Sequence, residues 1–347
     1  EAAAQAIAQG QIDGMGVARQ FLADGAWITK MLEEREEDIR PCICCHNGCF
    51  NFCSYKGHAN VQDLSDSMGL ARCALNPETM QSKKYHLTPA RRSKTIAVIG
   101  GGIGGMETAL VCAKRGHKVT LYEKSEQLGG VFRAAAAPSF KEKDRALIAW
   151  YQREIRKYPI EVKRNAEVSD LSSVTADEIV VATGAKPISL PLPGMEKGIQ
   201  AVDFLLGNRP VGENVTIIGG GLTGCEIAYE LYLQGKKPTI VEMKDDLIAV
   251  KGVCLANSSY LRDFFKTNQV PVHLETTLRE IQEDGVLVAD KNGMTYKIHA
   301  DSVILSIGYK PSPLAQKAKH IHIVGDADHV GNLRTVIWQA WDVGMKL

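Results

Sequence analysis

A short apolar strand that ends in a glycine-rich turn occurs twice in this chain and constrains its fold more than any other feature. Residues 97–105 read Ala-Val-Ile-Gly-Gly-Gly-Ile-Gly-Gly, and residues 216–224 read Thr-Ile-Ile-Gly-Gly-Gly-Leu-Thr-Gly, an offset of 119. A second pair, residues 177–187 and 301–311, repeats at an offset of 124. From Lys94 onward, β-branched strands alternate with alanine-rich helices. The pattern predicts an α/β fold with two Rossmann-like dinucleotide-binding domains.

Each copy carries three glycines in the G-x-G-x-x-G spacing. The first glycine permits a tight turn, the second lets pyrophosphate approach the backbone, and the third packs helix against strand. An acid, Glu123 or Glu242, follows the third glycine by 18 residues in both copies and is placed to accept hydrogen bonds from ribose hydroxyls. An ordinary tight turn before a helix is the alternative, which the matched acids disfavour. The predicted dinucleotide-binding glycines are Gly100, Gly102 and Gly105 in the first copy and Gly219, Gly221 and Gly224 in the second.

The acid of the second copy bears on which nicotinamide cofactor binds there. A carboxylate at Glu242 repels the 2′-phosphate of NADPH and accepts the 2′-hydroxyl of NADH. Lys244 is the only nearby residue that argues for NADPH. We therefore expect NADH to be the cofactor of this copy, with NADPH disfavoured.

Cysteines concentrate ahead of the first copy. Five of the nine lie between Cys42 and Cys53, and the run Cys42-x2-Cys45-x3-Cys49 is followed by Cys73. Four thiolates of this kind hold either tetrahedral zinc or an iron-sulfur cluster. The position just before a nucleotide domain favours a cluster, because zinc has no redox chemistry.

The remaining cysteines are assigned by context. Cys44 and Cys53 are surplus to a four-thiolate set, although Cys45-x3-Cys49-x3-Cys53 is a compact alternative. Hydrophobic surroundings predict that the other three are core residues. His46 is expected to be exposed to solvent rather than to donate to a cluster sulfur. The predicted core cysteines are Cys112, Cys225 and Cys254.

Composition excludes several classes of protein. The chain has 41 basic and 40 acidic side chains, a formal charge of +1, so it lacks the field that attracts nucleic acid or an anionic membrane. It has no apolar run of roughly 18 residues and no basic leader. Cysteines too sparse for a disulfide scaffold indicate a reducing compartment, and we expect a cytoplasmic protein. The chain lacks an initiating Met, and we expect it to be a piece of a longer protein.

The cysteine run, residues 73–77 (Cys-Ala-Leu-Asn-Pro) and residues 100–107 together resemble the family of 2,4-dienoyl-CoA reductase, enoate reductase and trimethylamine dehydrogenase. The resemblance runs from one end of the chain to the other. It implies the C-terminal half of a protein that joins an FMN-bearing (β/α)8 barrel to a 4Fe-4S cluster and to an FAD domain interrupted by an NAD(H) domain. One departure is the gap of 23 residues between Cys49 and Cys73, which is longer than in the dienoyl-CoA reductase branch.

The resemblance implies four regions. Residues 1–40 would be the C-terminal end of the barrel; their residue pattern predicts a helix over 1–9, a strand over 14–18, a loop over 19–25 and a helix over 26–39. The other implied regions are the iron-sulfur segment and linker (41–92), the FAD domain (93–190 and 312–347) and the inserted NAD domain (191–311).

The resemblance also assigns residues to cofactors. Arg19 would bind the FMN phosphate, a surface arginine being the alternative, and Asp326 would bind the ribityl chain of FAD, a helix N-cap being the alternative. Gly308 joins the NAD residues of the second copy. The implied cluster ligands are Cys42, Cys45, Cys49 and Cys73. The implied FAD residues are Gly100, Gly102, Gly105, Glu123, Gly130, Thr183, Gly184 and Asp326.

The function implied is transfer of electrons from NADH through FAD and the cluster to FMN, which reduces an activated C=C bond in a small enoate or enoyl thioester. The catalytic residues are expected in the barrel, and none is assigned in this chain. The expected partners are the small-molecule substrate, the remainder of the barrel and a second copy of the protein in a homo-oligomer, with no nucleic acid or membrane. The alternatives are an amine dehydrogenase whose nucleotide half holds ADP, a protein like the small subunit of glutamate synthase, and a zinc-bearing scaffold without turnover.

Overall fold

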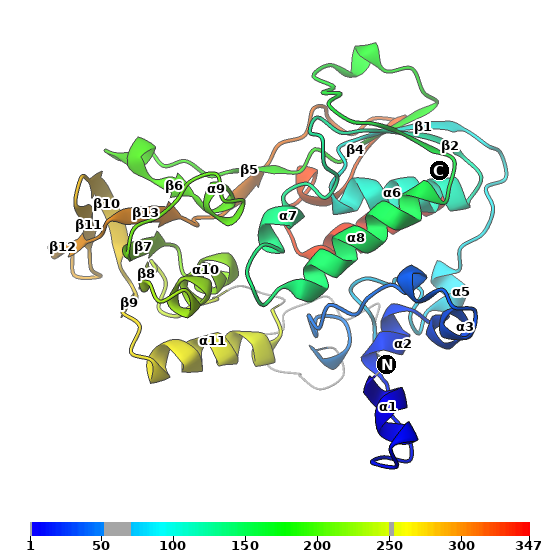
Figure 1. Cartoon of the computed structure of the whole chain (residues 1–347). Helices are drawn as coiled ribbons and strands as arrows, with labels where there is room; N and C mark the ends of the chain where they lie inside the picture. Colours follow the sequence, from blue (N-terminus) through cyan, green and yellow to red (C-terminus); the bar gives the residue numbers. More distant parts are fainter. Residues whose placement is uncertain (1, 52–70, 250–252) are drawn as a thin grey trace.

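The structure, a computed structural model, describes residues 2–51, 71–249 and 253–347. Two lobes, each built around a parallel sheet, lie side by side, and the N-terminal segment packs beneath the first of them (Figure 1). We call residues 93–190 and 312–347 the first module and residues 191–311 the second module. Helix α1 extends away from both (Figure 1).

The first module is a five-stranded parallel sheet in the order β15-β4-β1-β2-β3. Helices cover one face of this sheet, and the chain leaves the module after β4 and returns at β15. The strands are β1 (Thr95–Ile99), β2 (Lys118–Tyr122), β3 (Ile160–Lys163), β4 (Glu178–Val181) and β15 (Ile321–Ile323). The helices are α6 (Ile103–Lys114), α7 (Phe132–Ala135), α8 (Glu142–Arg156), α12 (Leu333–Lys346) and the 3-10 turns η2 (Leu171–Ser173) and η4 (Gly325–Ala327).

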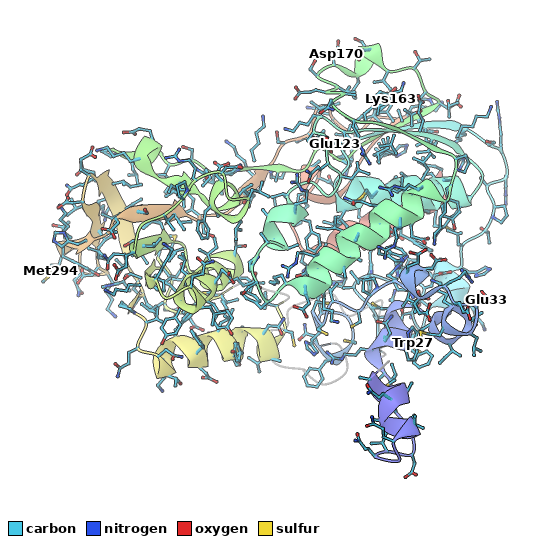
Figure 2. The ribbon with its side chains drawn as sticks, in the orientation of Figure 1. Trp27, Glu33, Glu123, Lys163, Asp170 and Met294 are labelled. Carbon is cyan, nitrogen blue, oxygen red and sulfur yellow. The ribbon has the colours of Figure 1, made fainter. Side chains whose placement is uncertain are left out.

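The second module repeats this sheet in the order β6-β13-β7-β8-β9 and adds a three-stranded antiparallel sheet, β10-β11-β12, with Met294 near its tip (Figure 2). Its parallel strands are β6 (Ile199–Gln200), β7 (Asn214–Ile218), β8 (Lys237–Val241), β9 (Val272–His273) and β13 (Ser302–Leu305). The antiparallel strands are β10 (Thr277–Gln282), β11 (Gly285–Ala289) and β12 (Thr295–His299). The helices are η3 (Met195–Lys197), α9 (Ala201–Leu205), α10 (Leu222–Leu233) and α11 (Leu255–Thr267).

The sequence repeat is also a structural repeat. Strand β1 pairs with β2 in the register Thr95↔Lys118, and β7 pairs with β8 in the register Asn214↔Lys237, so both partners are displaced by the same 119 positions. Two linker strands, β5 (Ala185–Pro187) and β14 (Tyr309–Pro311), pair antiparallel and form a ribbon between the modules. The predicted α/β class with two Rossmann-like modules is confirmed.

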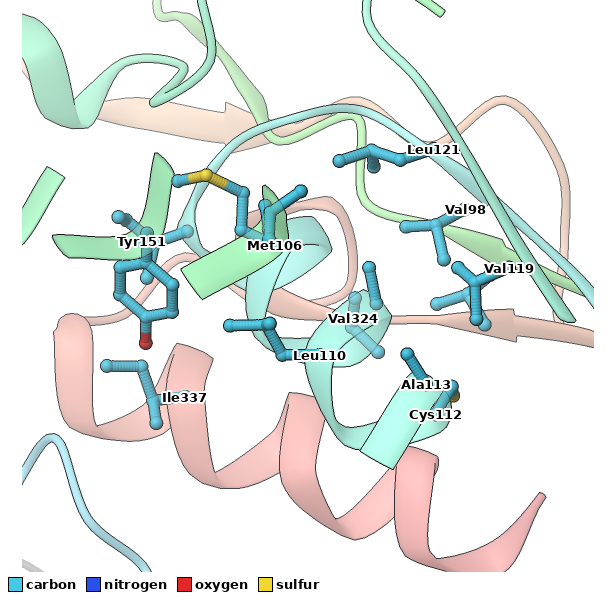
Figure 3. Packing of buried hydrophobic residues seen from close by; sticks show 14 of the residues in the cluster. Val98, Met106, Leu110, Cys112, Ala113, Val119, Leu121, Tyr151, Val324 and Ile337 are labelled. Atoms are coloured by element: carbon cyan, nitrogen blue, oxygen red, sulfur yellow. The ribbon is translucent and has the colours of Figure 1, made fainter. Parts of the chain in front are cut away.

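The core of the first module is built around α6, which lies between the sheet and α12 (Figure 3). Met106 and Leu110 on α6 are buried against Tyr151 of α8 and Ile337 of α12. Glycine permits this close helix packing, because a Cβ at Gly344 of α12 would lie 2.7 Å from Val111 Cγ1. Helix α12 therefore forms one wall of the first module.

The N-terminal segment departs from its prediction in three places. Residues 14–18 form no strand, because no neighbouring strand in the described part of the chain pairs with their backbone. The predicted loop after them contains α2 (Arg19–Ala23), and the predicted helix over 26–39 is divided into α3 (Trp27–Leu32) and η1 (Glu36–Asp38). The division falls at Glu34, whose φ of +54° is left-handed and incompatible with a continuous helix.

Tertiary contacts explain these departures. Gln20 of α2 donates to the Arg40 carbonyl at 2.8 Å and accepts from the Cys42 N–H at 3.0 Å, so this helical turn is held by the segment that follows it. Buried Asp24 accepts from Lys30 Nζ at 2.6 Å and from the Arg40 N–H at 2.8 Å. The chain therefore folds back at residues 33–35 instead of continuing as one helix. Helices α1 (Ala2–Ala8) and α5 (Ser82–Tyr85) complete the segment before β1.

Within residues 2–51, 71–249 and 253–347, no helix combines the length and the apolar character that a membrane-spanning helix needs.

Candidate functional site

The three glycines of the first loop are required for three different reasons. Gly100 has a φ of +112°, and a Cβ there would lie 2.4 Å from the Ala182 carbonyl oxygen. A Cβ at Gly105 would lie 1.8 Å from the Gly100 carbonyl oxygen, so this glycine allows α6 to lie against the turn. At Gly102 the nearest atom to a Cβ, the Gly130 Cα, is 3.9 Å away. The first and third glycines are therefore required by close backbone packing, and the second leaves space free of a side chain where a phosphate would approach.

The second loop repeats this division of roles. A Cβ at Gly219 would lie 2.3 Å from the Ser306 carbonyl oxygen, and one at Gly224 would lie 1.9 Å from the Gly219 carbonyl oxygen. Gly221 has no atom within 4 Å of its Cβ position. Neither α6 nor α10 has a side chain that caps its first turn. Their free N–H groups and helix dipoles form the type of site that binds anions.

The two acids have the same environment. Glu123, labelled in Figure 2, is 7% exposed and accepts from the Gly101 N–H at 2.7 Å and from the Ser125 N–H at 2.8 Å. Glu242 is 8% exposed and accepts from the Gly220 N–H at 2.6 Å and from the Lys244 N–H at 2.9 Å. Each carboxylate therefore anchors its own glycine loop. A carboxylate oxygen has further lone pairs, so both acids remain able to accept from a ribose hydroxyl.

Lys244, the residue that favours NADPH, forms a hydrogen bond within its own loop. Its Nζ donates to the Ala249 carbonyl at 2.9 Å, and the ammonium is exposed. A bond to a backbone carbonyl leaves this cation less free to meet a 2′-phosphate. The preference for NADH stays a prediction.

The other predicted FAD residues lie around the first loop and its exit. Gly130 has a φ of +55°, and a Cβ there would lie 3.0 Å from the Gly102 Cα, so its backbone packs closely against the phosphate loop. Thr183 donates to the Ser312 carbonyl at 2.9 Å, and the Gly184 carbonyl accepts from the Ser312 N–H at 3.1 Å. These contacts join the chain where it leaves the first module to the chain where it returns.

Gly308 occupies the equivalent exit of the second module. It has a φ of +98°, and its carbonyl accepts from the Ile188 N–H at 3.0 Å. Its predicted role in binding NAD is untested, and its observed role is to join the two linkers.

Asp326 lies in η4 and is partly buried. Its Oδ1 accepts from the Gly331 N–H at 3.0 Å, and burial raises the pKa of its carboxyl above the ordinary value. The N-cap of α12 is Asn332, which forms a capping box with Thr335, so the N-cap alternative for Asp326 is wrong. Its remaining oxygen is available to a ligand at the start of α12, and a role with FAD stays a prediction.

The structure brings the four predicted cluster cysteines to one pocket. Cys42, Cys45, Cys49 and Cys73 all line a cavity of about 20 Å³. The eight described cysteines are free of disulfides. Cys112, Cys225 and Cys254 are buried, as predicted for core residues.

Gly48 explains how Cys73 reaches the pocket across 23 residues of sequence. A Cβ at Gly48 would lie 2.9 Å from both the Arg72 carbonyl oxygen and the Ala74 nitrogen, and the Arg72 N–H donates to the Gly48 carbonyl at 2.7 Å. The two stretches of backbone therefore touch, which places Cys49 beside Cys73. Cys53, the competing candidate, lies outside the described residues.

The cysteines line the pocket as free thiols. Among the described residues, no three His, Cys, Asp or Glu side chains are grouped as a single metal ion would require. The Leu75 N–H donates to Cys73 Sγ at 3.4 Å. Burial raises the pKa of Cys45 to about 12 and that of Cys73 to about 11. A thiol in such surroundings stays protonated unless a bound cation compensates the thiolate charge.

Arg19 and His46 lie at the rim of this pocket. Arg19 Nη1 contacts His46 Nε2, and burial and the Arg19 charge lower the pKa of His46. The imidazole is half-buried, so the expectation of a solvent-exposed histidine is wrong. Arg19 is thus placed beside the cysteines, and its proposed contact with an FMN phosphate is untested.

Sequence reasoning missed the residues that join the cysteine pocket to the first module. The Arg72 side chain is fully buried, with its guanidinium 4.2 Å from the centre of the Trp338 ring on α12. Trp338 in turn donates to the Cys73 carbonyl at 3.0 Å, and Arg334 donates to Asn47 Oδ1 at 3.0 Å. No motif signals these residues, because the pairing joins positions more than 260 apart in sequence.

A second buried link was also missed. Tyr151 donates to Glu107 Oε2 at 2.8 Å in the interior, next to the loop that carries Cys42. The Arg40 guanidinium stacks 4.6 Å from the Trp150 ring and contacts the Leu75 carbonyl. The cysteine segment is thus anchored to both α8 and α12.

Two joined Rossmann-like modules with uncapped glycine loops define a protein that binds dinucleotides at two sites. The family model described as pyridine nucleotide-disulphide oxidoreductase matches residues 58–173 and 94–329, and the chain belongs to this family. The predicted class, a flavin oxidoreductase that binds FAD and NAD, is confirmed.

Similar proteins also support the more specific resemblance. The chain is 37% identical to cinnamate reductase of Clostridium sporogenes over 100% of this chain and 51% of the relative, and 33% identical to NADH oxidase of Thermoanaerobacter brockii over 100% of this chain and 54% of the relative. The solved structure of 2-naphthoyl-CoA reductase superposes with a TM-score of 0.88 at 28% identity, over 99% of this chain and 52% of that one. The predicted likeness to the enoate reductase family is confirmed, and the chain spans about half the length of these relatives.

Proposed function

We propose that this chain is the electron-input half of an NADH-dependent iron-sulfur flavoenzyme that reduces an activated C=C bond in a small molecule. FAD, a 4Fe-4S cluster and FMN, when bound, would supply the redox chemistry that carries electrons from NADH to the double bond. The protein's own residues bind, orient and insulate these groups.

One observation carries the proposal: α12 contacts both the predicted FAD site and the cysteine pocket. Asp326 and the capped start of α12 lie at the flavin end, and Trp338 of the same helix donates to the Cys73 carbonyl. A rigid helix that holds both sites supports electron transfer between them. A zinc-bearing scaffold without turnover would not require a helix that joins the flavin site to the cysteine pocket.

We propose that the cysteine pocket holds an iron-sulfur cluster and not zinc. Its four thiols line one pocket beside the first nucleotide module, where a redox-active group can pass on electrons, and zinc has no redox chemistry. We propose Cys42, Cys45, Cys49 and Cys73 as its ligands.

The exposed apolar side chains of the N-terminal segment support a missing barrel as partner. Seven large hydrophobic residues before residue 33 are between 37% and 81% exposed, which is unusual for a stretch of this length. A further domain that packs on them would remove this surface from water. They are Ile7, Ile12, Met15, Phe21, Ile28, Met31 and Leu32.

The substrate class follows from the relatives. Two of them are named for reduction of cinnamate and of 2-naphthoyl-CoA, an aryl enoate and an aryl thioester. We propose a conjugated carboxylic acid or its thioester as substrate, a cytoplasmic location consistent with free cysteines, and self-association of the full protein.

Anaerobic titration of the purified holoenzyme with NADH tests the proposal. We expect the flavin and iron-sulfur absorption bands to bleach together, iron to be present in place of zinc, and a cinnamate-type acid to restore both bands. Bleaching of flavin alone, or zinc without iron, would contradict the proposed route. Equal rates with NADPH would contradict only the choice of NADH.

A further inference from the structure

The two nucleotide modules touch through a set of polar contacts away from their linkers. In the first module, Ser139 and Lys141 lie between α7 and α8; in the second, Glu226 and Glu230 lie on α10. Lys141 Nζ donates to Glu226 Oε1 at 2.6 Å, and the Ser139 N–H and Oγ both donate to Glu230 Oε2, at 3.0 and 2.8 Å. We call these four residues the intermodule latch.

The latch is shielded from water, which strengthens its contacts. The side chains of Lys141 and Glu226 are 22% and 18% exposed, and Glu230 is 8% exposed. Phe140, between the two latch residues, packs edge-on against Tyr229 of α10 with ring centres 5.1 Å apart. A partly buried ion pair with an aromatic contact beside it resists sliding better than an exposed pair does.

The first-module side of the latch is preset by Arg145 of α8. Its guanidinium donates to the carbonyls of Ala136 at 2.8 Å, Pro138 at 2.7 Å and Ser139 at 3.1 Å. The loop is therefore held in shape without help from the second module. Because this loop is already ordered, little conformational entropy is lost when α10 packs against it.

The latch lies between the two glycine loops. Helix α7 begins just after Gly130, which supports the first phosphate loop, and α7 also contacts α9 of the second module. Glu226 lies about one turn from the start of α10, whose N-terminus faces the second phosphate loop. A short path of rigid contacts thus joins the loop predicted for FAD to the loop predicted for NADH.

We propose that Lys141 and Ser139 are positioning residues that hold the second module in the orientation needed for hydride transfer from NADH to FAD. This inference rests on the proposed function. In that step the C4–H bond of the nicotinamide breaks, hydride carries two electrons to the flavin N5, NADH becomes NAD⁺ and FAD is reduced. The ribbon β5–β14 alone would permit rotation between the modules, because small polar interfaces within a chain commonly allow domain motion.

Lys141→Ala in the holoenzyme tests the latch. We expect the rate constant of flavin reduction at saturating NADH, measured by anaerobic stopped flow, to fall about tenfold to a hundredfold, the range for misplaced reactants. The Kd for NADH and the FAD content should stay within about twofold, because neither glycine loop is altered. Lys141→Arg should recover most of the rate. An unchanged rate constant, or an equal loss in Lys141→Arg, would overturn the inference.

Reversing the charges of Lys141 and Glu226 distinguishes a lost module orientation from a general loss of folded structure. Lys141→Glu and Glu226→Lys alone should each slow flavin reduction, and the double variant should recover it. Lys237→Ala is the control for loss of a lysine ion pair as such, since Lys237 pairs with Glu213 at 2.6 Å inside the second module, at an exposed position. A slow double variant, or a control as slow as Lys141→Ala, would overturn the latch. If the Glu226 variants fail to fold, Ser139→Ala, which removes the Oγ donor to Glu230, should slow flavin reduction, and an unchanged rate constant would overturn the latch.

A second readout keeps the latch distinct from the proposed function. Hydrogen exchange in residues 185–187 and 309–311 should accelerate in Lys141→Ala and not in Lys237→Ala, because the released modules strain their linker. Unchanged exchange there would overturn the latch whether or not NADH reduces the flavin. Failure of NADH to reduce the flavin of the unsubstituted enzyme would overturn the proposed function alone.

Discussion

The two nucleotide modules share one backbone plan but differ on the face of the sheet that the helices leave uncovered. In the second module, Ile218 and Val241 on that face are buried beneath β10–β12. Their counterparts at the same offset are Ile99, which is also buried, and Tyr122, which is half-buried; among the described residues, no three-stranded antiparallel sheet covers them. A pocket of about 270 Å³ lies there instead, lined by side chains that include Thr95, Thr120, Tyr122 and Glu161.

The helices differ in the opposite sense. In α6, 11 of 12 residues are buried, because α8 and α12 cover its outer side, whereas only six of the 12 residues of α10 are buried. The loops differ too: the position of Gly129, with a φ of +123°, is taken in the second module by Ile248, with a φ of +52°. A duplicated module can therefore keep its nucleotide loop while each copy buries its hydrophobic side chains on different faces.

The largest expected effect comes from the third glycine of each loop. Gly105→Ala and Gly224→Ala would each place a Cβ against a carbonyl oxygen. For Gly105→Ala, at the start of the buried helix α6, we expect the free energy of unfolding to fall by about 3–5 kcal/mol. The loss should be smaller for α10, whose exposed side can shift outward. Thermal unfolding and bound-flavin content measure this; equal losses at both positions would contradict the difference between the helices.

Substitution of Arg72 should give the next largest loss of stability, and the loss should be confined to the first module, whose helix α12 Arg72 contacts. Arg72→Met should cost about 2–4 kcal/mol, because it removes a buried guanidinium stacked on Trp338. Hydrogen exchange should accelerate in α12 and α6 and remain unchanged in α10 and α11. Arg92→Met, at an exposed position before β1, serves as the control. Uniform acceleration across both modules would show that they unfold as one unit.

A pH effect is expected where the modules meet. Burial raises the pKa of Asp144 to about 6, with Lys141 lowering it and Glu226 and Glu142 raising it. Because the folded pKa lies above the unfolded value, the stability associated with its protonated form is complete below about pH 4 and is lost as the pH rises through 6. Asp144→Asn should raise stability by on the order of 2 kcal/mol at pH 7.5 and add nothing at pH 4. Urea unfolding at both pH values measures this, and a gain at pH 4 would contradict the assignment.

The smallest expected effect tests the matched acids. Glu242→Gln should weaken NADH binding about tenfold and leave FAD content unchanged, whereas Glu123→Gln should lower FAD retention and leave the Kd for NADH unchanged. A glutamine side chain has only one acceptor oxygen, and its NH₂ group cannot accept a hydrogen bond from the N–H of Gly220 or Gly101. Each substitution should therefore also weaken the hydrogen bonds that hold its glycine loop. If Glu242→Gln lowered FAD content instead, the two loops would have the reverse assignment.

Most of the two modules could be predicted from local sequence. The glycine spacing, the acids at Glu123 and Glu242 and the repeat offsets all report backbone geometry that depends on neighbouring residues, and the strand registers repeat at that offset. The strand predicted at residues 14–18 was wrong because a strand requires a pairing partner, which residue patterns cannot supply. His46 is half-buried instead of fully exposed, and its ring contacts Arg19, 27 positions away, which residue patterns do not report.

The amino-acid sequence by itself determined the duplicated nucleotide fold, its glycine loops and the set of cysteines, because each is a short-range requirement on the backbone or on residue type. Only the tertiary structure decided that Gly48 lies against Arg72 so that Cys73 completes the pocket, that Trp338 ties this pocket to α12, and that Lys141 meets Glu226 between the modules. These contacts join residues that are far apart along the chain, and they exist because folding buries both partners together.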